Sequence, residues 1–298
     1  DSDFDCEGCF SGTAIEFEDR HILAYTGVSK NKKGETLQNQ CLAEGDGLCY
    51  KKILQNPVIS AANVPFEFQK GDFRDSKMWR EDGKFYMACV LKMPDGKGAL
   101  VCFRSENLLD WKFVSVIDKS SGKSGMWECP DIFKLDGKDV VIFSPQEMKA
   151  DFENGLHDGN NSVYMTGFLK RPEFIFEREM RTENSLNFAQ IDGGIDFYAT
   201  QTCLAPDGRR IMIAWMQNWE SYITPQNYLW SGMMTFPREL EFKNGKLFQN
   251  PVRELLLYRK KCECGVVSGT SSFIKNGFSH GDIELEFFSA FEKLLICL

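Results

Sequence analysis

Two carboxylates in this sequence have the type and setting for acid–base chemistry: Glu128 in the segment MWECPDIF and Asp75 in the segment FRDSKMW. Met, Trp and Phe surround Glu128, and an apolar setting favours the protonated form of a carboxyl group. A carboxylic acid that keeps its proton near neutral pH is what a general acid requires, so we predict this role for Glu128. The structural alternative is a Glu that only pairs with a neighbouring Arg.

The segments that carry these carboxylates are expected to be β-strands. Short runs rich in Val, Ile, Phe, Tyr and Trp alternate with turn dipeptides, and long amphipathic helical periods are nearly absent. Each turn predicts a hairpin, because Asp-Gly and Asn-Gly favour type I′ turns with positive φ at both central residues. Five such turns are expected, at Glu18-Asp19, Asp82-Gly83, Asp136-Gly137, Asp207-Gly208 and Asn244-Gly245.

The strand before each turn carries a polar group at a similar distance from that turn. The offsets are eight positions from Ser11 to Asp19, seven from Asp75 to Asp82 and eight from Glu128 to Asp136. Equivalent positions in equivalent hairpins indicate structural repeats, spaced roughly 35 to 70 residues apart, a range that brackets β-propeller blades. The inner strands of a propeller surround one channel, so we predict that Asp75 and Glu128 share a phase and converge on one site. The alternative is a β-sandwich with coincidental polar residues on its edge strands.

Aromatic residues indicate the kind of ligand that such a site would bind. Carboxylates and Arg hydrogen-bond sugar hydroxyls, and aromatic rings pack on the apolar faces of sugar rings. The aromatic residues close to the two carboxylates, or at comparable positions, are Phe10, Trp79, Trp127 and Tyr198. We therefore predict a site for a small sugar.

Five motifs follow one another along the chain: FSGTA at 10–14, FRDSKMW at 73–79, MWECPDIF at 126–133, DFYATQT at 196–202 and TFPREL at 235–240. With this ordered set the chain resembles glycoside hydrolase family 32, which contains invertases, sucrose-6-phosphate hydrolases and related β-fructofuranosidases. The resemblance runs from Gly8 to about Arg259. It implies an all-β fold: a five-bladed β-propeller, here residues 1–250, followed by a β-sandwich that begins in residues 251–298.

The resemblance also implies roles for individual residues. Glu128 corresponds to the general acid/base of a retaining double-displacement mechanism, and Asp75 to the carboxylate that binds fructose hydroxyls and stabilises the transition state. Arg74 is expected to lower the pKa of Asp75 and keep it ionised while Glu128 stays protonated. Cys129 is expected to point away from Glu128 on the strand and to serve packing.

Further residues are expected around the substrate. Phe10 and Ser11 match substrate-contact positions of the family, and Tyr198, Trp219 and Trp230 are expected in the pocket wall. Each has a structural alternative: Phe10 could belong to the core, Ser11 could cap a turn and Trp219 could pack between blades.

The sequence departs from the family in three places. Ser76 replaces the proline after the family's carboxylate, which predicts local loosening around Asp75. No segment matches the family's nucleophile motif Trp-Met-Asn-Asp-Pro-Asn-Gly, and Asp1, Asp3 and Asp5 are not expected to replace it. A full sandwich normally needs around 100 residues, more than follow the propeller here. We therefore expect that most of the first blade and part of the sandwich are missing, and that the chain alone does not cleave its substrate.

Composition limits the partners and the cellular setting. A net charge of −8, with both signs interspersed, argues against nucleic acid or an anionic membrane. It favours a neutral or small polar substrate, and the resemblance implies sucrose, sucrose 6-phosphate or a fructan. Eleven scattered cysteines, among them Cys89 and Cys102 in apolar runs, indicate reduced core thiols and a cytoplasmic protein. No His lies near the close Cys pairs, so no zinc and no other cofactor is expected. An inactive sugar-binding relative and a fructosyltransferase are the alternative functions.

Overall fold

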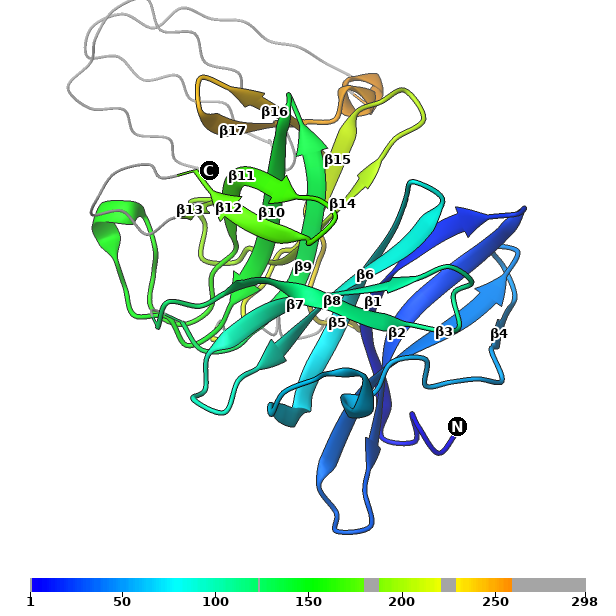
Figure 1. Ribbon diagram of the computed structural model, residues 1–298. Coiled ribbons are helices and arrows are strands. Elements are labelled where there is room, and N and C mark those ends of the chain that lie inside the picture. The colour runs from blue at the N-terminus through cyan, green and yellow to red at the C-terminus, as the bar shows by residue number, and fades with distance from the viewer. Residues whose placement is uncertain (1, 123, 180–187, 221–228, 259–298) are drawn as a thin grey trace, which may run out of the picture. The chain divides into compact units, whose positions relative to one another are not determined.

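The computed structural model is almost entirely β (Figure 1) and describes residues 2–122, 124–179, 188–220 and 229–258. Contacts between residues divide the chain into two compact units, 1–252 and 253–298. Within the described part, the first unit holds every strand, and the second begins with the 3₁₀ helix η3 (Arg253–Tyr258). The sandwich predicted to begin in residues 251–298 therefore falls largely outside the described residues.

The first unit consists of four antiparallel sheets, each with its strands in chain order. The first sheet contains β1 (Gly8–Phe17), β2 (Arg20–Lys30), β3 (Thr36–Gly45) and β4 (Tyr50–Lys52). The second contains β5 (Gln69–Glu81), β6 (Lys84–Lys92), β7 (Gly98–Ser105) and β8 (Lys112–Lys119). The third contains β9 (Trp127–Leu135), β10 (Lys138–Pro145), β11 (Val163–Lys170), β12 (Ile175–Arg178) and the short β13 (Ala189–Gln190), which pairs with β11. The fourth contains β14 (Tyr198–Leu204), β15 (Arg210–Trp215), β16 (Arg238–Lys243) and β17 (Lys246–Pro251).

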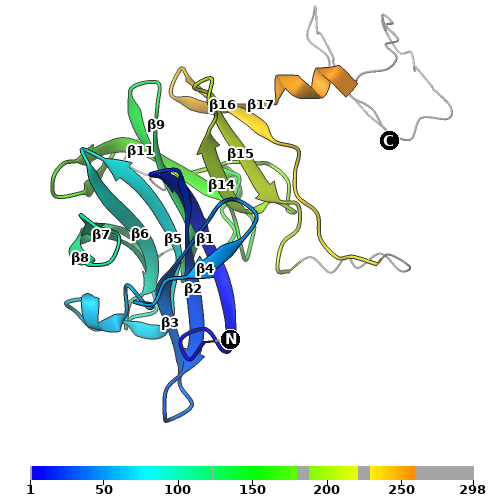
Figure 2. The same cartoon turned by 90° about the vertical axis from the view of Figure 1, so that its right-hand side faces the viewer.

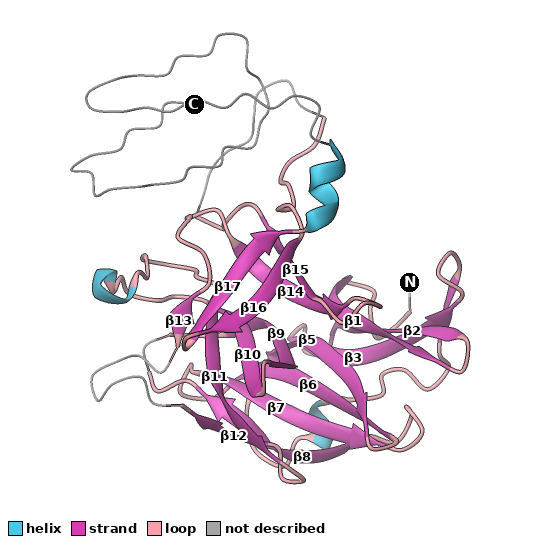
Figure 3. Cartoon of the chain, turned by 90° about the horizontal axis from the view of Figure 1, so that it is seen from above, coloured by secondary structure: helices cyan, strands magenta, loops and turns pink. Residues whose placement is uncertain are grey.

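The first strands of the four sheets are neighbours in succession. Strand β1 packs beside β5, β5 beside β9, and β9 beside β14. Figure 2 shows β1 and β5 side by side, and Figure 3 shows β5 and β9 in the middle of the unit. Sheets that follow one another around a shared axis, each with its first strand innermost, are the blades of a β-propeller. The predicted propeller is confirmed, with four blades in the described part of the chain, and the sandwich alternative is wrong for this unit.

Apolar side chains between neighbouring sheets hold the blades together. On β6, Met87 and Cys89 belong to the apolar cluster shared with the first blade, whereas Ala88 and Val90 belong to the cluster shared with the third. Both faces of the strand are buried, and β6 is therefore a continuous apolar run rather than an alternating one. A third apolar cluster, which includes Phe133 of the third blade, joins the third blade to the fourth.

Four of the five predicted turns have the expected geometry. Both central residues take positive φ at Glu18-Asp19, Asp82-Gly83, Asp136-Gly137 and Asn244-Gly245. Asp207-Gly208 also joins two antiparallel strands, β14 and β15, as predicted, but the type I′ geometry is wrong there: only Gly208 has positive φ, and the loop extends from Ala205 to Arg209. Pro206 explains the longer loop, because it lacks the amide that a two-residue hairpin would require from it.

Helical structure is sparse in the first unit. The 3₁₀ helices η1 (Ala61–Asn63) and η2 (Phe152–Asn154) each lie in a connection between strands. Among the described residues, no helix has the length and apolar character needed to cross a membrane.

Candidate active site

Each of the four inner strands contains a β-bulge, and β5 has a further register shift between Gln69 and Phe73. The extra residues lie after Phe10 in β1, Arg74 in β5, Glu128 in β9 and Tyr198 in β14. In three of the strands the residue that follows has positive φ: Asp75, Cys129 and Ala199. A bulge bends the strand and re-aims its side chains. The four bulges therefore set the directions in which the site residues point.

The positions of the bulges show that Asp75 and Glu128 do not occupy the equivalent positions predicted for them on their strands. Arg74 and Glu128 each precede the extra residue of their strand, and Asp75 is equivalent to Cys129, not to Glu128. The prediction was wrong by one residue, because Asp75 lies seven positions before Asp82 whereas Glu128 lies eight before Asp136, and the two turns are equivalent. The two carboxylates still meet, but from adjacent positions on neighbouring strands.

Arg74 is the cation at the centre of the site. Its Nε lies 3.0 Å from Oε1 of Glu128, and its Nη1 lies 2.8 Å from Oδ1 of Asp72 and 3.3 Å from Oε1 of Gln38. The side chains of Arg74 and Glu128 are only 10% and 14% exposed. Burial alone would lower the pKa of Arg74, but the neighbouring carboxylates, Glu128 above all, raise it. The ion pair named as the structural alternative for Glu128 is therefore present.

Tyr198 holds the second oxygen of the Glu128 carboxylate. Its hydroxyl donates to Oε2 of Glu128 at 2.7 Å and lies 3.3 Å from the carbonyl oxygen of Ser144. Burial, followed by the charge of Glu128, raises the pKa of Tyr198, so its hydroxyl stays protonated and acts as a donor. The predicted residues Glu128, Arg74 and Tyr198 thus come together in one cluster.

Asp75 lies beside this cluster and is buried. Its Oδ2 accepts a hydrogen bond from the amide of Cys129 at 2.9 Å. Burial and the charge of Glu128 raise its pKa to about 6, against the opposing effects of the Cys129 amide and Arg74. Arg74 lowers the pKa of Asp75 as predicted, but burial and the charge of Glu128 outweigh it, so the prediction of a low pKa is wrong.

Cys129 also differs from its prediction in part. It is buried, as expected for packing, and burial raises the pKa of its thiol well above the usual value, which makes it a poor nucleophile. Its amide donates to Oδ2 of Asp75, and the charge of Asp75 also raises the pKa of the thiol. Positive φ at Cys129 breaks the strict alternation of the strand, so this residue does not simply point away from the site.

A second set of polar residues lies further along the inner strands. Nζ of Lys77 lies 3.0 Å from Oδ1 of Asp131 and donates to the carbonyl oxygen of Thr202 at 3.0 Å. Oδ2 of Asp131 accepts from both the amide and the hydroxyl of Thr202 at 2.7 Å. Three inner strands, β5, β9 and β14, are joined here. Lys77 and Asp131 were not among the predicted site residues, although they lie in the motifs FRDSKMW and MWECPDIF.

Two glutamines of β3 also escaped the sequence analysis. The oxygen of Gln38 accepts from the Phe73 amide at 2.9 Å, and the nitrogen of Gln40 donates to the Phe73 carbonyl at 2.9 Å. The signal in the sequence was the run Gln38-Asn39-Gln40 beside apolar residues, because polar side chains within a buried strand require internal partners. These glutamines hold the backbone that leads into Arg74.

The other predicted residues lie at varying distances from this cluster. Phe10 and Ser11 are exposed on β1, the inner strand next to β5, which disfavours a core role for Phe10. Trp219 is exposed and contacts Trp215, the residue paired with Tyr198 across β14 and β15. Trp230 is exposed, and none of the contacts described above involves it. Substrate roles for these four residues stay predictions.

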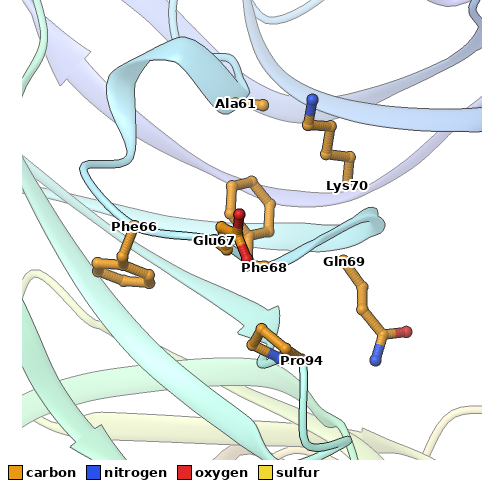
Figure 4. A pocket seen from close by; sticks show the side chains of 7 residues that line it. All are labelled: Ala61, Phe66, Glu67, Phe68, Gln69, Lys70 and Pro94. Atoms are coloured by element: carbon orange, nitrogen blue, oxygen red, sulfur yellow. The ribbon is translucent and has the colours of Figure 1, made fainter.

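A surface hollow of about 400 Å³ lies near the start of β5 (Figure 4). It is lined by Ala61, Phe66, Glu67, Phe68, Gln69, Lys70 and Pro94. None of the predicted site residues lines it, so it is separate from the cluster around Glu128. The described residues also contain no group of three or more His, Cys, Asp or Glu side chains arranged to hold a metal ion.

Comparisons with known proteins identify the family and the fold. The model of the glycosyl hydrolases family 32 N-terminal domain matches residues 1–251. The chain belongs to glycoside hydrolase family 32. Sucrose-6-phosphate hydrolase from Bacillus subtilis is 38% identical over 268 residues, which cover 86% of this chain and 53% of that protein. Raffinose invertase from Escherichia coli is 34% identical over 273 residues, with 87% and 53% covered. The family 32 chain thus spans about half the length of these curated relatives.

Solved structures of family 32 members have the same fold. The β-fructofuranosidase of Bombyx mori superimposes with a TM-score of 0.76 at 32% identity, covering 85% of this chain and 52% of that one. Sucrose-6-phosphate hydrolase from Lactobacillus gasseri gives a TM-score of 0.74 at 27% identity, covering 87% and 52%. The family assignment made from the five motifs is confirmed.

Proposed function

We propose that the protein containing this family 32 chain hydrolyses the terminal β-D-fructofuranoside bond of sucrose or sucrose 6-phosphate, with retention of configuration. The observation that carries the proposal is the placement of Glu128 between Arg74 and Tyr198, with Asp75 beside it from the neighbouring blade. The names of the relatives support the substrate class, since they include sucrose-6-phosphate hydrolases and an invertase. A Bombyx mori relative is also described in complex with sucrose.

In this proposal Glu128 gives a proton to the leaving glycosidic oxygen and later takes one from the attacking water. Between these steps Glu128 is charged, and Arg74 and the Tyr198 hydroxyl stabilise that charge through its two oxygens. Asp75 binds fructose hydroxyls and acts as an electrostatic stabiliser of the transition state. Both hydrogen-bond partners of Glu128 therefore act during the same catalytic cycle.

A retaining mechanism also needs a carboxylate nucleophile about 5 to 5.5 Å from the acid/base. The family's nucleophile motif is not present in this sequence, so we assign the nucleophile to a segment outside it. Asp5 is a poor substitute, because its buried carboxylate already binds Lys52 at 2.6 Å and the Tyr25 hydroxyl at 3.0 Å. We therefore expect the 298-residue chain alone to leave sucrose intact.

The test is sucrose and sucrose 6-phosphate hydrolysis by the full-length protein that contains this chain, compared with its Glu128→Gln variant. Loss of general acid–base catalysis should lower kcat by about 10²- to 10⁴-fold. Glu179→Gln is the matched control, since Glu179 contacts the exposed side of Lys138 and should leave kcat unchanged. Unchanged hydrolysis by Glu128→Gln would exclude the acid/base role.

Two further measurements separate the alternatives. Products formed at high sucrose concentration distinguish hydrolysis, which releases fructose, from transfer to another sugar. Turnover by the 298-residue chain alone would contradict the assignment of the nucleophile to another segment. Fructoside binding without any cleavage by the full-length protein would favour an inactive sugar-binding relative.

A further inference from the structure

The bulge of each later inner strand is tied to the preceding blade through one backbone amide. The amide of Asp75 donates to Oγ1 of Thr26 at 3.1 Å, and the amide of Ala199 donates to Oγ of Ser144 at 3.1 Å. At the junction between them, the amide of Cys129 donates to Oδ2 of Asp75 at 2.9 Å. All three donors are the positive-φ residues of their bulges. The amide at the equivalent bulge position is therefore bound at three successive junctions between blades. A hydroxyl accepts it at two of them and a carboxylate at the remaining one.

Strand register explains why one junction differs from the other two. Thr26 pairs with Phe10 across β1 and β2, and Ser144 pairs with Glu128 across β9 and β10. The equivalent residue of the second blade, paired with Arg74, is Val90. Valine has no hydrogen-bond acceptor, so the second blade cannot bind the next amide from this position.

The side chain next to each of these residues is also polar in the first and third blades and apolar in the second. Thr26 pairs with Gln40, whose side-chain oxygen accepts from the Thr26 hydroxyl at 3.0 Å. The hydroxyls of Ser144 and Ser162 lie 3.2 Å apart. Val90 instead pairs with Leu100, and both are fully buried. The first and third blades thus carry a buried polar pair where the second blade carries an apolar one.

We propose that Asp75 has a second role, as the clasp between the second and third blades that fixes the backbone around Glu128. Oδ2 of Asp75 replaces the hydroxyl that the second blade lacks, and it binds the amide directly after Glu128 in the chain. Without this acceptor the buried amide of Cys129 would lose its partner, and a bulge that depends on it would relax. The effect of this clasp on catalysis by Glu128 rests on the proposed function, whereas the hydrogen bond between Asp75 and the Cys129 amide does not.

This role leaves Asp75 with one oxygen for the substrate. Oδ2 binds the Cys129 amide of the third blade, so in the proposed function we assign the contact with a fructose hydroxyl to Oδ1. Asp75 would then bind sugar and position Glu128 with opposite ends of the same carboxylate. Replacement of Asp75 by Ala should remove both functions, whereas Asp75→Asn keeps a neutral acceptor that can bind the Cys129 amide.

Hydrogen exchange of single amides, followed by NMR, tests the clasp without reference to activity. In Asp75→Ala the Cys129 amide should exchange roughly tenfold faster, as expected when a buried hydrogen bond is lost. Asp75→Asn should keep most of the protection. Thr26→Val is the matched control, because it should expose the amide of Asp75 while leaving that of Cys129 protected.

A second variant tests the equivalence of the blades. Adding Val90→Thr to Asp75→Ala supplies a hydroxyl at the position that Thr26 and Ser144 occupy, and it should restore protection of the Cys129 amide. In the hydrolysis assay the double variant should recover only the part of kcat that depends on the position of Glu128, because the sugar contact and the transition-state charge of Asp75 are still missing.

Each outcome decides a separate point. Unchanged exchange at Cys129 in Asp75→Ala would overturn the clasp, and failure of Val90→Thr to restore protection would overturn the equivalence of the blades. If Asp75→Ala does not fold, loss of Cys129 protection is instead sought in Asp75→Leu, with Asp75→Asn as the reference. Suppose that hydrogen exchange is as predicted but the full-length protein neither binds nor cleaves fructosides. The clasp is then supported and the proposed function is refuted.

Discussion

Replacement of Lys77 by Met should destabilise the propeller by about 3 kcal/mol, because it leaves a buried carboxylate without its cation. The side chains of Lys77 and Asp131 are 12% and 0% exposed, and Nζ lies 3.0 Å from Oδ1. Loss of one partner of a buried ion pair costs about 3–5 kcal/mol. In the variant Thr202 still donates two hydrogen bonds to Oδ2 of Asp131. The expected loss of stability therefore lies at the lower end of this range.

The measurement is urea unfolding at neutral pH, followed by tryptophan fluorescence, with calorimetry as a second probe. For a unit of this size each kcal/mol lowers Tm by about 2–4 °C, so the expected fall is about 6–12 °C. Lys97→Met is the control: Lys97 pairs with Asp95 on the surface, with side chains 43% and 56% exposed. Such an exposed pair contributes about 0–1 kcal/mol.

A compensating variant separates charge burial from lost packing. Asp131→Asn added to Lys77→Met removes the uncompensated charge and keeps an acceptor for Thr202, so it should recover part of the stability. Equal losses in Lys77→Met and Lys97→Met would refute the reasoning, since they would mean that water screens the buried pair as it screens the surface one. No recovery in the double variant would assign the loss to packing.

Three other predictions follow from the site. Because the pKa of Asp75 is raised from 3.8 to about 6, the folded state binds a proton that the unfolded state releases, and the free energy of unfolding should fall as pH rises through that window. Urea titrations should show this slope flattened in Asp75→Asn, and an unchanged slope would contradict it. Tyr198→Phe removes the donor to Glu128 and should cost about 1–2 kcal/mol in urea unfolding with a lower kcat for sucrose; a variant equal to wild type in both would exclude the contact. Asn160 begins an Asn-Asn-Ser sequon, but it is buried and its amide donates to Glu220 at 2.6 Å, so mass spectrometry after expression in a glycosylating host should find no glycan there; an occupied site would show that this loop opens.

The predictions that succeeded depend on local physics. Positive φ at Asp82-Gly83 follows from the turn residues themselves, and the buried strand β6 follows from its apolar run. The error at Asp207-Gly208 was also local, since Pro206 was available in the sequence as a reason for a longer loop. The motifs identified the family because their order along the chain is specific to it.

The sequence predicted which residues form the site better than it predicted their ion pairs and pKa values. Glu128, Arg74 and Tyr198 were all named and do converge, but Lys77 and Asp131 were missed, although their motifs had been identified. An ion pair between strands 54 residues apart depends on which blades are neighbours, and no local pattern contains that information.

By itself the sequence determined the hairpins, the all-β class and the family, because turn chemistry, side-chain alternation and motif order are properties of short segments. Only the tertiary structure decided where the bulges lie and hence where the carboxylates point, since the bulges after Arg74 and Glu128 interrupt the side-chain alternation on which the sequence prediction relied. It also decided that Asp75, rather than being held at a low pKa by Arg74, has a raised one. Burial and the distribution of one guanidinium among several carboxylates depend on contacts between blades, and those contacts exist only once the propeller has formed.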